Sequence, residues 1–250
     1  MREFLQDLST NKILGGYISI LQPKKGFRVG IDSILLASSI NNCSCCLELG
    51  SGSGVISVCI AKRILNVEIL GIENNIELVN IANKNVDMNG LSENNIKFLC
   101  LDVVGKEFQI LHNNYFDQVV MNPPYFSEKS VNPSKNTEIF AARYESKSFL
   151  EDWINIAYKK LIPKGSLNFI FRTESIDRVL AILNPHWGDI RIYPLWPKAG
   201  IESKLFLIQA KKDVKTKAKI LPGMILHNNN GSYTDACNDV LLNRDLVQMS

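Results

Sequence analysis

The stretch that decides the fold is Glu48-Leu49-Gly50-Ser51-Gly52-Ser53-Gly54. It follows a short β-rich run and precedes a run, 55–65, with apolar residues at helical spacing. Glycines at such a turn let the backbone bend sharply and let a ligand approach without Cβ collisions. The helix that follows presents unpaired N–H groups to that ligand. The pattern is G-x-G-x-G and not the G-x-G-x-x-G of dinucleotide sites, so we expect a different nucleoside ligand.

The alternation of strand and helix continues on both sides of this turn. Strands are predicted at 46–49, 68–72, 96–101, 116–121, 167–171, 190–193 and 205–210, and helices at 55–65, 76–88, 149–161 and 174–183. This alternation is typical of βαβ units and predicts an α/β fold with a parallel sheet. We expect one domain over 1–250, with an N-terminal hairpin and helix at 13–40, a core at 41–210, and a basic loop and tail at 211–250. Asp32 or Ser33 is the expected N-cap of the early helix.

Composition sets broad limits on the function. The 250 residues carry a net charge of +3 with 46% hydrophobic and 21% charged residues, which is typical of a globular protein and too weakly basic to identify a nucleic-acid-binding domain by charge alone. No signal peptide and no apolar stretch of about 18 residues is evident, so we expect a cytoplasmic protein without a membrane partner. Cys43 and Cys46 form a C-x-x-C, but no second pair or nearby histidine accompanies it, so no metal is expected.

Two acids follow the next strands. Glu73 ends the second strand, nineteen residues beyond Gly54, and Asp102 follows the third. A carboxylate accepts two hydrogen bonds at once, which suits the ribose hydroxyls, and Asp102 is placed to accept from an adenine amino group. Each acid alone is more often a turn residue or a helix cap. Features at three successive strand ends, on the edge where doubly wound sheets bind ligands, indicate a site.

Asn122-Pro123-Pro124-Tyr125-Phe126 follows the fourth strand. A conjugated exocyclic amine is a poor nucleophile because its lone pair is delocalised. The Asn122 side-chain oxygen and the Pro123 carbonyl are able to accept from its two N–H bonds, which aims the lone pair at an electrophile. The prolines stiffen the loop, and Tyr125 offers a face on which a planar base stacks. This motif therefore predicts transfer to an amino nitrogen.

Together, the glycine turn, Glu73, Asp102 and Asn122-Pro123-Pro124-Tyr125 resemble the S-adenosylmethionine-dependent methyltransferases of the Rossmann-like class. N-P-P-Y is the variant found in enzymes that methylate adenine 6-amino groups or glutamine amides. The flanking segments 22–37, 142–145 and 221–227 are similar to the bacterial valine-tRNA adenine-N6 methyltransferase family. This resemblance implies an α/β, Rossmann-like, mostly parallel sheet of seven strands, with helices on both faces and one antiparallel strand in its last hairpin. It also implies an N-terminal hairpin and helix that cover the cofactor site.

The resemblance also implies roles for individual residues. S-adenosylmethionine is the implied cofactor, and its site is expected to comprise Glu48, Gly50, Ser51, Gly52, Gly54, Glu73, Asp102, Val103 and Asn122. The implied catalytic residues are Asn122, Pro123, Pro124 and Tyr125. An RNA substrate, expected to be tRNA, should contact Tyr125, Phe126, Arg143, Lys24, Lys25 and Arg28. The lysines at 211, 212, 215, 217 and 219 are a second group of candidates for contact with RNA phosphates.

Three alternatives remain open at the level of the sequence. A glutamine methyltransferase acting on a protein such as a release factor shares N-P-P-Y, but that family usually carries a helical domain before the glycine turn, where only 47 residues stand here. A DNA adenine methyltransferase is disfavoured because no large insertion for target recognition is visible. A non-catalytic relative that binds RNA or cofactor is disfavoured by the intact Asn122 and glycine turn. The sequence does not indicate an oligomeric state.

Overall fold

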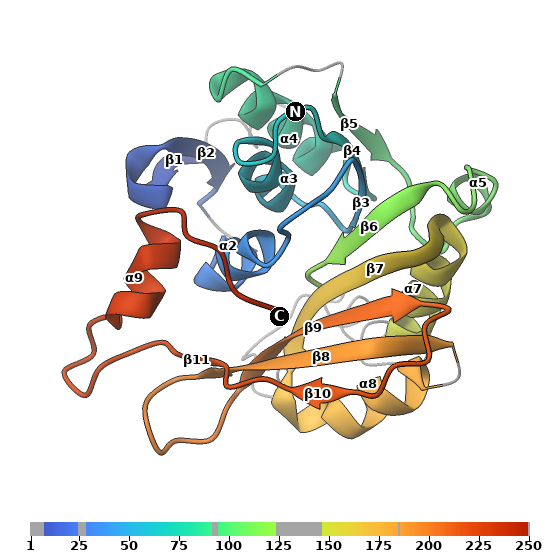
Figure 1. Ribbon diagram of the computed structural model, residues 1–250. Coiled ribbons are helices and arrows are strands. Elements are labelled where there is room, and N and C mark those ends of the chain that lie inside the picture. The colour runs from blue at the N-terminus through green and yellow to red at the C-terminus, as the bar shows by residue number, and fades with distance from the viewer. Residues whose placement is uncertain (1–7, 25–28, 92–94, 124–146, 185, 250) are drawn as a thin grey trace.

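The computed structural model describes residues 8–24, 29–91, 95–123, 147–184 and 186–249. A twisted sheet runs through its centre (Figure 1). The long strands are β3 (Cys45–Leu49), β4 (Glu68–Glu73), β5 (Ile96–Cys100), β6 (Phe116–Met121), β7 (Leu161–Arg172), β8 (Trp187–Trp196) and β9 (Leu205–Lys212). Their spatial order is β8-β9-β7-β6-β3-β4-β5, and β9 alone among them runs antiparallel to its neighbours. The mostly parallel sheet with one antiparallel strand is therefore confirmed.

Within the described residues the sheet has nine strands, not the seven expected. The additional strands, β10 (Lys219–Ile220) and β11 (Met224–Ile225), both pair with β8 and lengthen that edge of the sheet. Each contains two residues, which is too short to show an alternating pattern in the sequence. The antiparallel β9 is also longer than predicted and includes Lys211 and Lys212.

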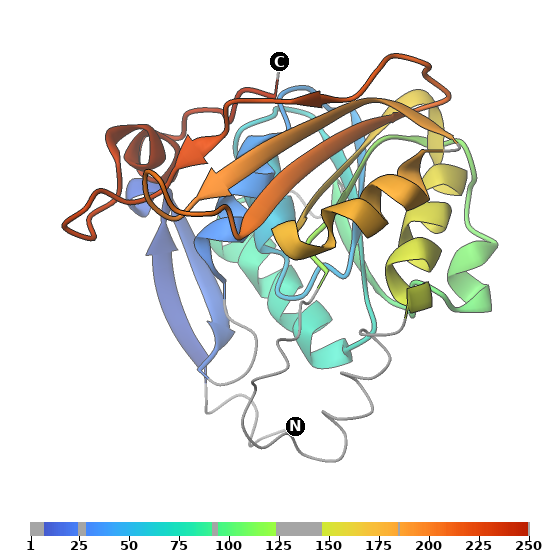
Figure 2. The ribbon, with the colours of Figure 1, turned by 90° about the horizontal axis from the view of Figure 1, so that it is seen from below.

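Helices cover both faces of the sheet, as Figure 2 shows from below. On one face pack α2 (Ile31–Ser38), α3 (Val55–Ala61), α4 (Ile76–Met88) and α9 (Asp235–Leu241), and on the other α5 (Lys106–Gln109), α7 (Lys147–Lys160) and α8 (Ile176–Leu183). The short helix η2 (Thr173–Ser175) precedes α8. Central strands are buried on both sides: in β6, Val120 faces the first helix layer and Val119 the second. That double burial explains the continuous apolar runs in the sequence.

The N-terminal hairpin forms a separate two-stranded sheet. Its strands are β1 (Leu8–Ile13) and β2 (Ile18–Pro23), joined by the short helix η1 (Leu14–Gly16), so the hairpin begins five residues earlier than expected. Asn85 and Asn89, one turn apart on α4, exchange hydrogen bonds with the backbone of Leu21 and Ser19. The two amides thus take the place of a neighbouring strand and fix the hairpin against the core.

The expected N-cap of α2 was wrong. Gly30 occupies the cap position and no side chain caps the helix. Because α2 begins at Ile31, Asp32 and Ser33 lie within its first turn, where their side chains contact Asn122 of the candidate site.

The basic loop expected to begin at Lys211 begins later, because Lys211 and Lys212 belong to β9. Lys212 is buried and donates to the Leu161 carbonyl and to Asn114, while Lys211 pairs with Asp189 at 3.1 Å. The loop that follows β9 lies beside the amino end of β8, where Asp189 N donates to the Thr216 carbonyl. These lysines therefore lie away from the carboxyl edge of the sheet.

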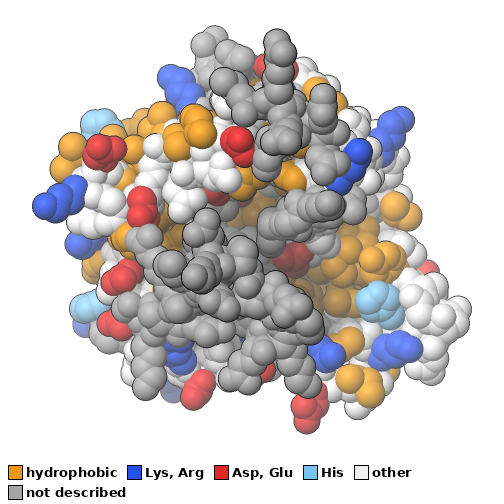
Figure 3. Space-filling model, turned by 180° about the vertical axis from the view of Figure 1, so that it is seen from behind, with side chains coloured by type: hydrophobic (Ala, Val, Ile, Leu, Met, Phe, Trp, Pro, Cys, Tyr) orange, Lys and Arg blue, Asp and Glu red, His pale blue; other side chains and the backbone are white. Residues whose placement is uncertain are grey.

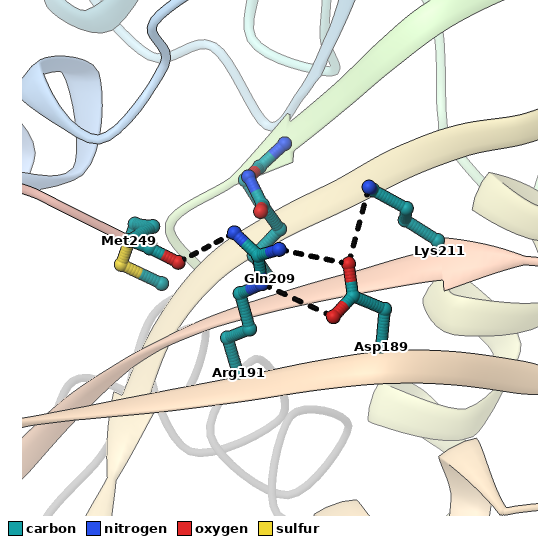
Figure 4. A network of polar contacts seen from close by, with 6 residues as sticks. Asp189, Arg191, Gln209, Lys211 and Met249 are labelled. Carbon is teal, nitrogen blue, oxygen red and sulfur yellow. Dashed lines mark hydrogen bonds and ion pairs between the residues drawn. The ribbon is translucent and has the colours of Figure 1, made fainter. Parts of the chain in front are cut away.

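The C-terminal segment is held on the sheet by a charged network, shown in Figure 4. Arg191 donates to both oxygens of Asp189, at 3.2 and 3.0 Å, and to the carbonyl of Met249 at 2.7 Å. Nearby, Val247 N donates to the Ser38 carbonyl at the end of α2. Val247 and Met249 are buried. The tail is thus an integral part of the core and packs against α2.

In the part of the chain that the structure describes, no helix is long and apolar enough to span a membrane. The same residues contain no group of three or more histidine, cysteine, aspartate or glutamate side chains arranged to hold a metal ion.

Candidate active site

Strand register places the residues after β3, β4 and β6 at one edge. Leu49, the last residue of β3, pairs with Met121 on one side and with Ile72 on the other. Gly50 and Asn122 both follow this row directly, on strands about 4.8 Å apart. Glu73 pairs with Cys100, so the acid of β4 and the loop that follows β5 share the edge. The parallel topology thus collects the nucleoside-binding and amine-binding candidates.

The backbone of the glycine turn favours glycine at all three positions, and two of them also lack space for a side chain. Gly50, Gly52 and Gly54 have φ of 69°, 54° and 75°, in the left-handed region. A Cβ on Gly50 would meet the Trp153 ring at 2.7 Å, and one on Gly54 would meet Phe98 at 2.8 Å. A Cβ on Gly52 would have no atom within 4 Å. The turn is therefore packed against neighbouring side chains at Gly50 and Gly54 and open at Gly52, where a ligand has room.

Glu73 joins the glycine turn to the neighbouring strand ends. Its Oε2 accepts from Gly52 N at 2.9 Å, its Oε1 accepts from Asn75 N at 3.0 Å, and its carbonyl accepts from Leu101 N. Burial raises the pKa of Glu73, and the backbone hydrogen bonds oppose that shift. The carboxylate thus fixes the open position of the turn and lies beside the space where ribose hydroxyls are expected.

Glu48 lies beneath the turn. Its side chain is 1% exposed and its Oε2 accepts from the backbone N of Ser57, at 3.1 Å, and from the Ser57 hydroxyl. Burial raises the pKa of Glu48 to about 8, although the Ser57 hydrogen bonds lower it. The carboxyl therefore binds the first turn of α3 directly, and its expected part in cofactor binding stays a prediction. Ser51 is also buried, and its Oγ has no hydrogen-bond partner among the described atoms.

Asp102 and Val103 form a turn after β5. Asp102 Oδ1 accepts from Val104 N at 3.1 Å and its carbonyl accepts from Gly105 N at 2.8 Å, while Val103 is buried. The turn holds the Asp102 backbone beside the end of β4, because Leu101 N donates to the Glu73 carbonyl. This position, next to the ribose candidate, is the one expected for an adenine contact.

Asn122 is oriented by the N-terminal helix. Its Nδ2 donates to Asp32 Oδ2 at 2.9 Å and to Ser33 Oγ at 3.1 Å. Both amide hydrogens are directed at α2, so the Asn122 side-chain oxygen points away from that helix. Pro123, which follows, is buried. Sequence analysis assigned Asp32 and Ser33 to capping, and no local pattern connects them with a residue ninety positions later.

Two further contacts were missed by sequence analysis. Asn85 Nδ2 donates to the Ser53 carbonyl in the glycine turn at 2.8 Å, while the same amide holds Leu21 of the hairpin. Trp153 of α7 packs over Gly50 and against Phe149, with ring centroids 4.7 Å apart. A buried asparagine on the otherwise apolar face of α4 is the one sequence signal that indicates the first contact.

Other predicted site residues fall outside the described residues: Pro124, Tyr125, Phe126, Arg143, Lys25 and Arg28. Lys24 is described and is exposed just beyond the end of β2. Figure 3 views the molecule from behind, and both hydrophobic and acidic side chains of described residues are visible on that face. The described residues thus include the candidates for nucleoside binding and the Asn122 amide.

Comparisons with known proteins agree with this geometry. Residues 28–176, more than half of the chain, match the family model described as "Methyltransferase small domain". A protein of Haemophilus influenzae (strain 86-028NP), called tRNA1(Val) (adenine(37)-N6)-methyltransferase, is 30% identical over 154 residues, which are 60% of this chain and 64% of that protein. A protein of the same name from Flavobacterium psychrophilum is 26% identical over 180 residues, 71% of this chain and 73% of that protein.

A solved structure is also similar. A predicted O-methyltransferase from Agrobacterium tumefaciens superposes with a TM-score of 0.72 at 23% identity, over 86% of this chain and 98% of that one, which shows the shared fold. The matches to the Haemophilus proteins span 64–66% of those relatives' length.

Proposed function

Because this chain belongs to the methyltransferase small domain family, we propose that it transfers the methyl group of S-adenosylmethionine to the exocyclic 6-amino group of an adenine in tRNA. The observation that carries this proposal is the position of Asn122. It directly follows the strand beside the glycine turn, and Asp32 and Ser33 fix its amide. The relatives named for adenine-N6 methylation of tRNA support the choice of substrate.

The cofactor site is supported by the shape and donors of the turn. S-adenosylmethionine supplies a methyl group bound to a positively charged sulfur. The open side of Gly52 admits the methionine part, and the left-handed glycines keep Cβ atoms out of its way. Glu73 is anchored by two backbone N–H groups and accepts from the ribose hydroxyls, and Asp102 with Val103 contacts the adenine.

Asn122 acts on the reacting nitrogen. The adenine 6-amino group is conjugated with its ring, so its lone pair is a weak nucleophile. The Asn122 oxygen, held away from α2, accepts one N–H of the amine, and the Pro123 carbonyl accepts the other. These two bonds draw the nitrogen toward tetrahedral geometry and direct its lone pair at the methyl group. The nitrogen–methyl bond would form as the sulfur–methyl bond breaks, which leaves a neutral thioether. The methylated nitrogen then loses its extra proton to water, so the mechanism needs no dedicated base.

The test is incubation with labelled S-adenosylmethionine and, separately, total tRNA, ribosomal RNA and protein, followed by mass spectrometry of nucleosides and amino acids. The expected product is N6-methyladenosine in tRNA. Asn122→Ala should lower kcat at least about 100-fold with nearly unchanged cofactor affinity, whereas Asn184→Ala, at the exposed end of α8, should match the wild type. Label in glutamine, or in no substrate, would refute the proposed function.

A further inference from the structure

A basic cavity lies away from the candidate active site, at the turn of the N-terminal hairpin. It has a volume of about 310 Å³ and lies where the hairpin turn, the ends of α2 and α3 and the segment after α9 meet. Tyr17, Ser38, Lys62, Arg63 and Arg244 line it, and no described residue of its lining is acidic. Three cations thus share one small cavity.

The backbone is arranged to bring these groups together. Gly15 in the hairpin turn has φ of 63°, and a Cβ there would lie 2.6 Å from the Leu242 carbonyl oxygen. This close approach seats the turn on the end of α9, as Figures 1 and 2 show. Arg244, two residues later, has φ of 67°, which is uncommon for a residue other than glycine. Such a conformation costs free energy, and it places the arginine against the hairpin.

Two of the cations contact one aromatic ring. Lys62 Nζ lies 4.8 Å and Arg244 Cζ lies 4.3 Å from the centroid of Tyr17. The two charges are therefore at most about 9 Å apart. Within the described residues, neither they nor Arg63 forms an ion pair. Like charges held this close repel each other, and an anion bound near both would offset that repulsion.

Arg63 adds an independent indication. One of its terminal nitrogens donates to the carbonyls of Ala37 and Ile40, which stabilises the end of α2. Its Nε is buried and has no acceptor among the described atoms. Burial also lowers the pKa of Arg63, so a nearby anion would favour its charged form. A buried N–H without a partner is rare in folded proteins, and an anion beside the guanidinium would offset the cost of burying its charge.

We propose that this cavity binds a phosphate group, held by Lys62, Arg63 and Arg244 beside Tyr17. A phosphate has several acceptor oxygens and so accepts from more than one cation at once. We assign that phosphate to the backbone of the RNA substrate, an assignment that rests on the proposed function, whereas the pocket itself does not. The helix α2, whose first turn contacts Asn122 and whose last turn lines the cavity, spans about 12 Å. An RNA whose adenine reaches Asn122 has phosphates at that distance.

The experiment compares Arg244→Gln with Lys97→Gln, which removes the same charge from an exposed position on β5. Arg244 is exposed, so its replacement leaves the core intact. We expect Arg244→Gln to weaken tRNA binding and to lower the salt slope of log K by about 0.9, the value for one phosphate contact. The ratio of variant to wild-type Kd should therefore be about 3.5-fold larger at about 50 mM than at about 200 mM salt. Lys97→Gln should keep the wild-type slope.

Inorganic phosphate tests the pocket without RNA. Phosphate at about 20 mM, compared with chloride at the same ionic strength, should raise the Tm of the wild type and of Lys97→Gln by about 2 °C. The Tm of Arg244→Gln should not change. A phosphate effect without an RNA effect supports the pocket but assigns it to a free phosphate compound. Wild-type behaviour of Arg244→Gln in both assays would overturn the proposal, even if the protein methylates tRNA. Conversely, a phosphate response in a protein that methylates no RNA would refute only the proposed function.

Discussion

The buried carboxyl of Glu48 makes the stability of the fold depend on pH in a way that one substitution should remove. Its pKa is raised from an ordinary value of 4.5 to about 8 by burial, so the folded state holds a proton that the unfolded chain has already released between these two values. The sign follows from linkage: a raised pKa gives a stabilising contribution that is complete below about 4.5 and lost as the pH rises through about 8.

The magnitude follows from the size of the shift. Each difference of one in pKa corresponds to about 1.4 kcal/mol, so ionisation of Glu48 costs the folded state at most about 5 kcal/mol at pH 9. Glu48→Gln keeps a carbonyl oxygen for the two Ser57 donors and cannot ionise. The free energy of unfolding of this variant, relative to the wild type, should therefore rise by several kcal/mol between pH 5 and pH 9.

Urea denaturation followed by circular dichroism at pH 5, 7 and 9 measures this difference. Glu73, whose pKa is also raised, contributes with the same sign in both proteins, so the comparison cancels its contribution apart from its repulsion of Glu48. The free energy of unfolding of Glu151→Gln, a variant at an exposed position of α7, should differ from that of the wild type by the same amount at every pH. If Glu48→Gln and the wild type differ by the same amount at pH 5 and pH 9, Glu48 is ionised in the folded protein and the reasoning about its burial is wrong.

Three further predictions concern the glycine turn, the helix that holds Asn122, and the tail. Gly54→Ala should lower the free energy of unfolding by about 2–4 kcal/mol, because φ is 75° and a Cβ there meets Phe98 at 2.8 Å. Gly52→Ala should lower it by only about 1 kcal/mol, but should weaken the binding of S-adenosylmethionine measured by calorimetry. Equal losses of stability in the two variants would contradict this geometry. Asp32→Ala should lower kcat roughly 10- to 100-fold with unchanged cofactor affinity, and Asp32→Asn, which keeps an acceptor for Asn122, should recover much of it. A purely structural role would make both variants lose cofactor affinity as well. Arg191→Gln removes the hydrogen bond to the Met249 carbonyl and should speed hydrogen exchange at the amide of Val247, which is bonded to Ser38, while Arg178→Gln on α8 should not.

Most of the fold followed from local patterns. The helix 76–88 and the strand 116–121 were predicted to the residue, because one has a clear helical period ended by Asn89-Gly90 and the other is buried on both faces. β7 is assigned from Leu161, six residues before its predicted start, but its register with β6 shifts between Phe116 and Gln118, and Lys164, between Pro163 and Gly165, has φ of 67°. The turn residues thus interrupt the strand, and regular pairing with both β6 and β9 begins at Ser166, one residue before the predicted start.

The site was predictable only where it follows strand ends. In a parallel sheet, the residue after each strand lies at one edge whatever the rest of the chain does, so the glycine turn, Glu73 and Asn122 were placed by topology. The side chains that fix them come from elsewhere: Asn85 from the middle of α4, Trp153 from α7, and Asp32 and Ser33 from the N-terminal helix. Such long-range partners leave no periodic signal, and the sequence offered local capping as an equally good use of Asp32.

The helix α2 connects the two sites proposed for the RNA. Its first turn holds Asn122 through Asp32 and Ser33, and its last turn carries Ser38, which lines the basic cavity and accepts from Val247 of the tail. Arg63, one of the three cations of that cavity, binds the carbonyls of Ala37 and Ile40. Eight residues of helix span about 12 Å, so a phosphate in the cavity and an adenine at Asn122 would contact opposite ends of one rigid element. Binding of the phosphate would then hold α2, and with it the amide that orients the reacting amine, before transfer takes place.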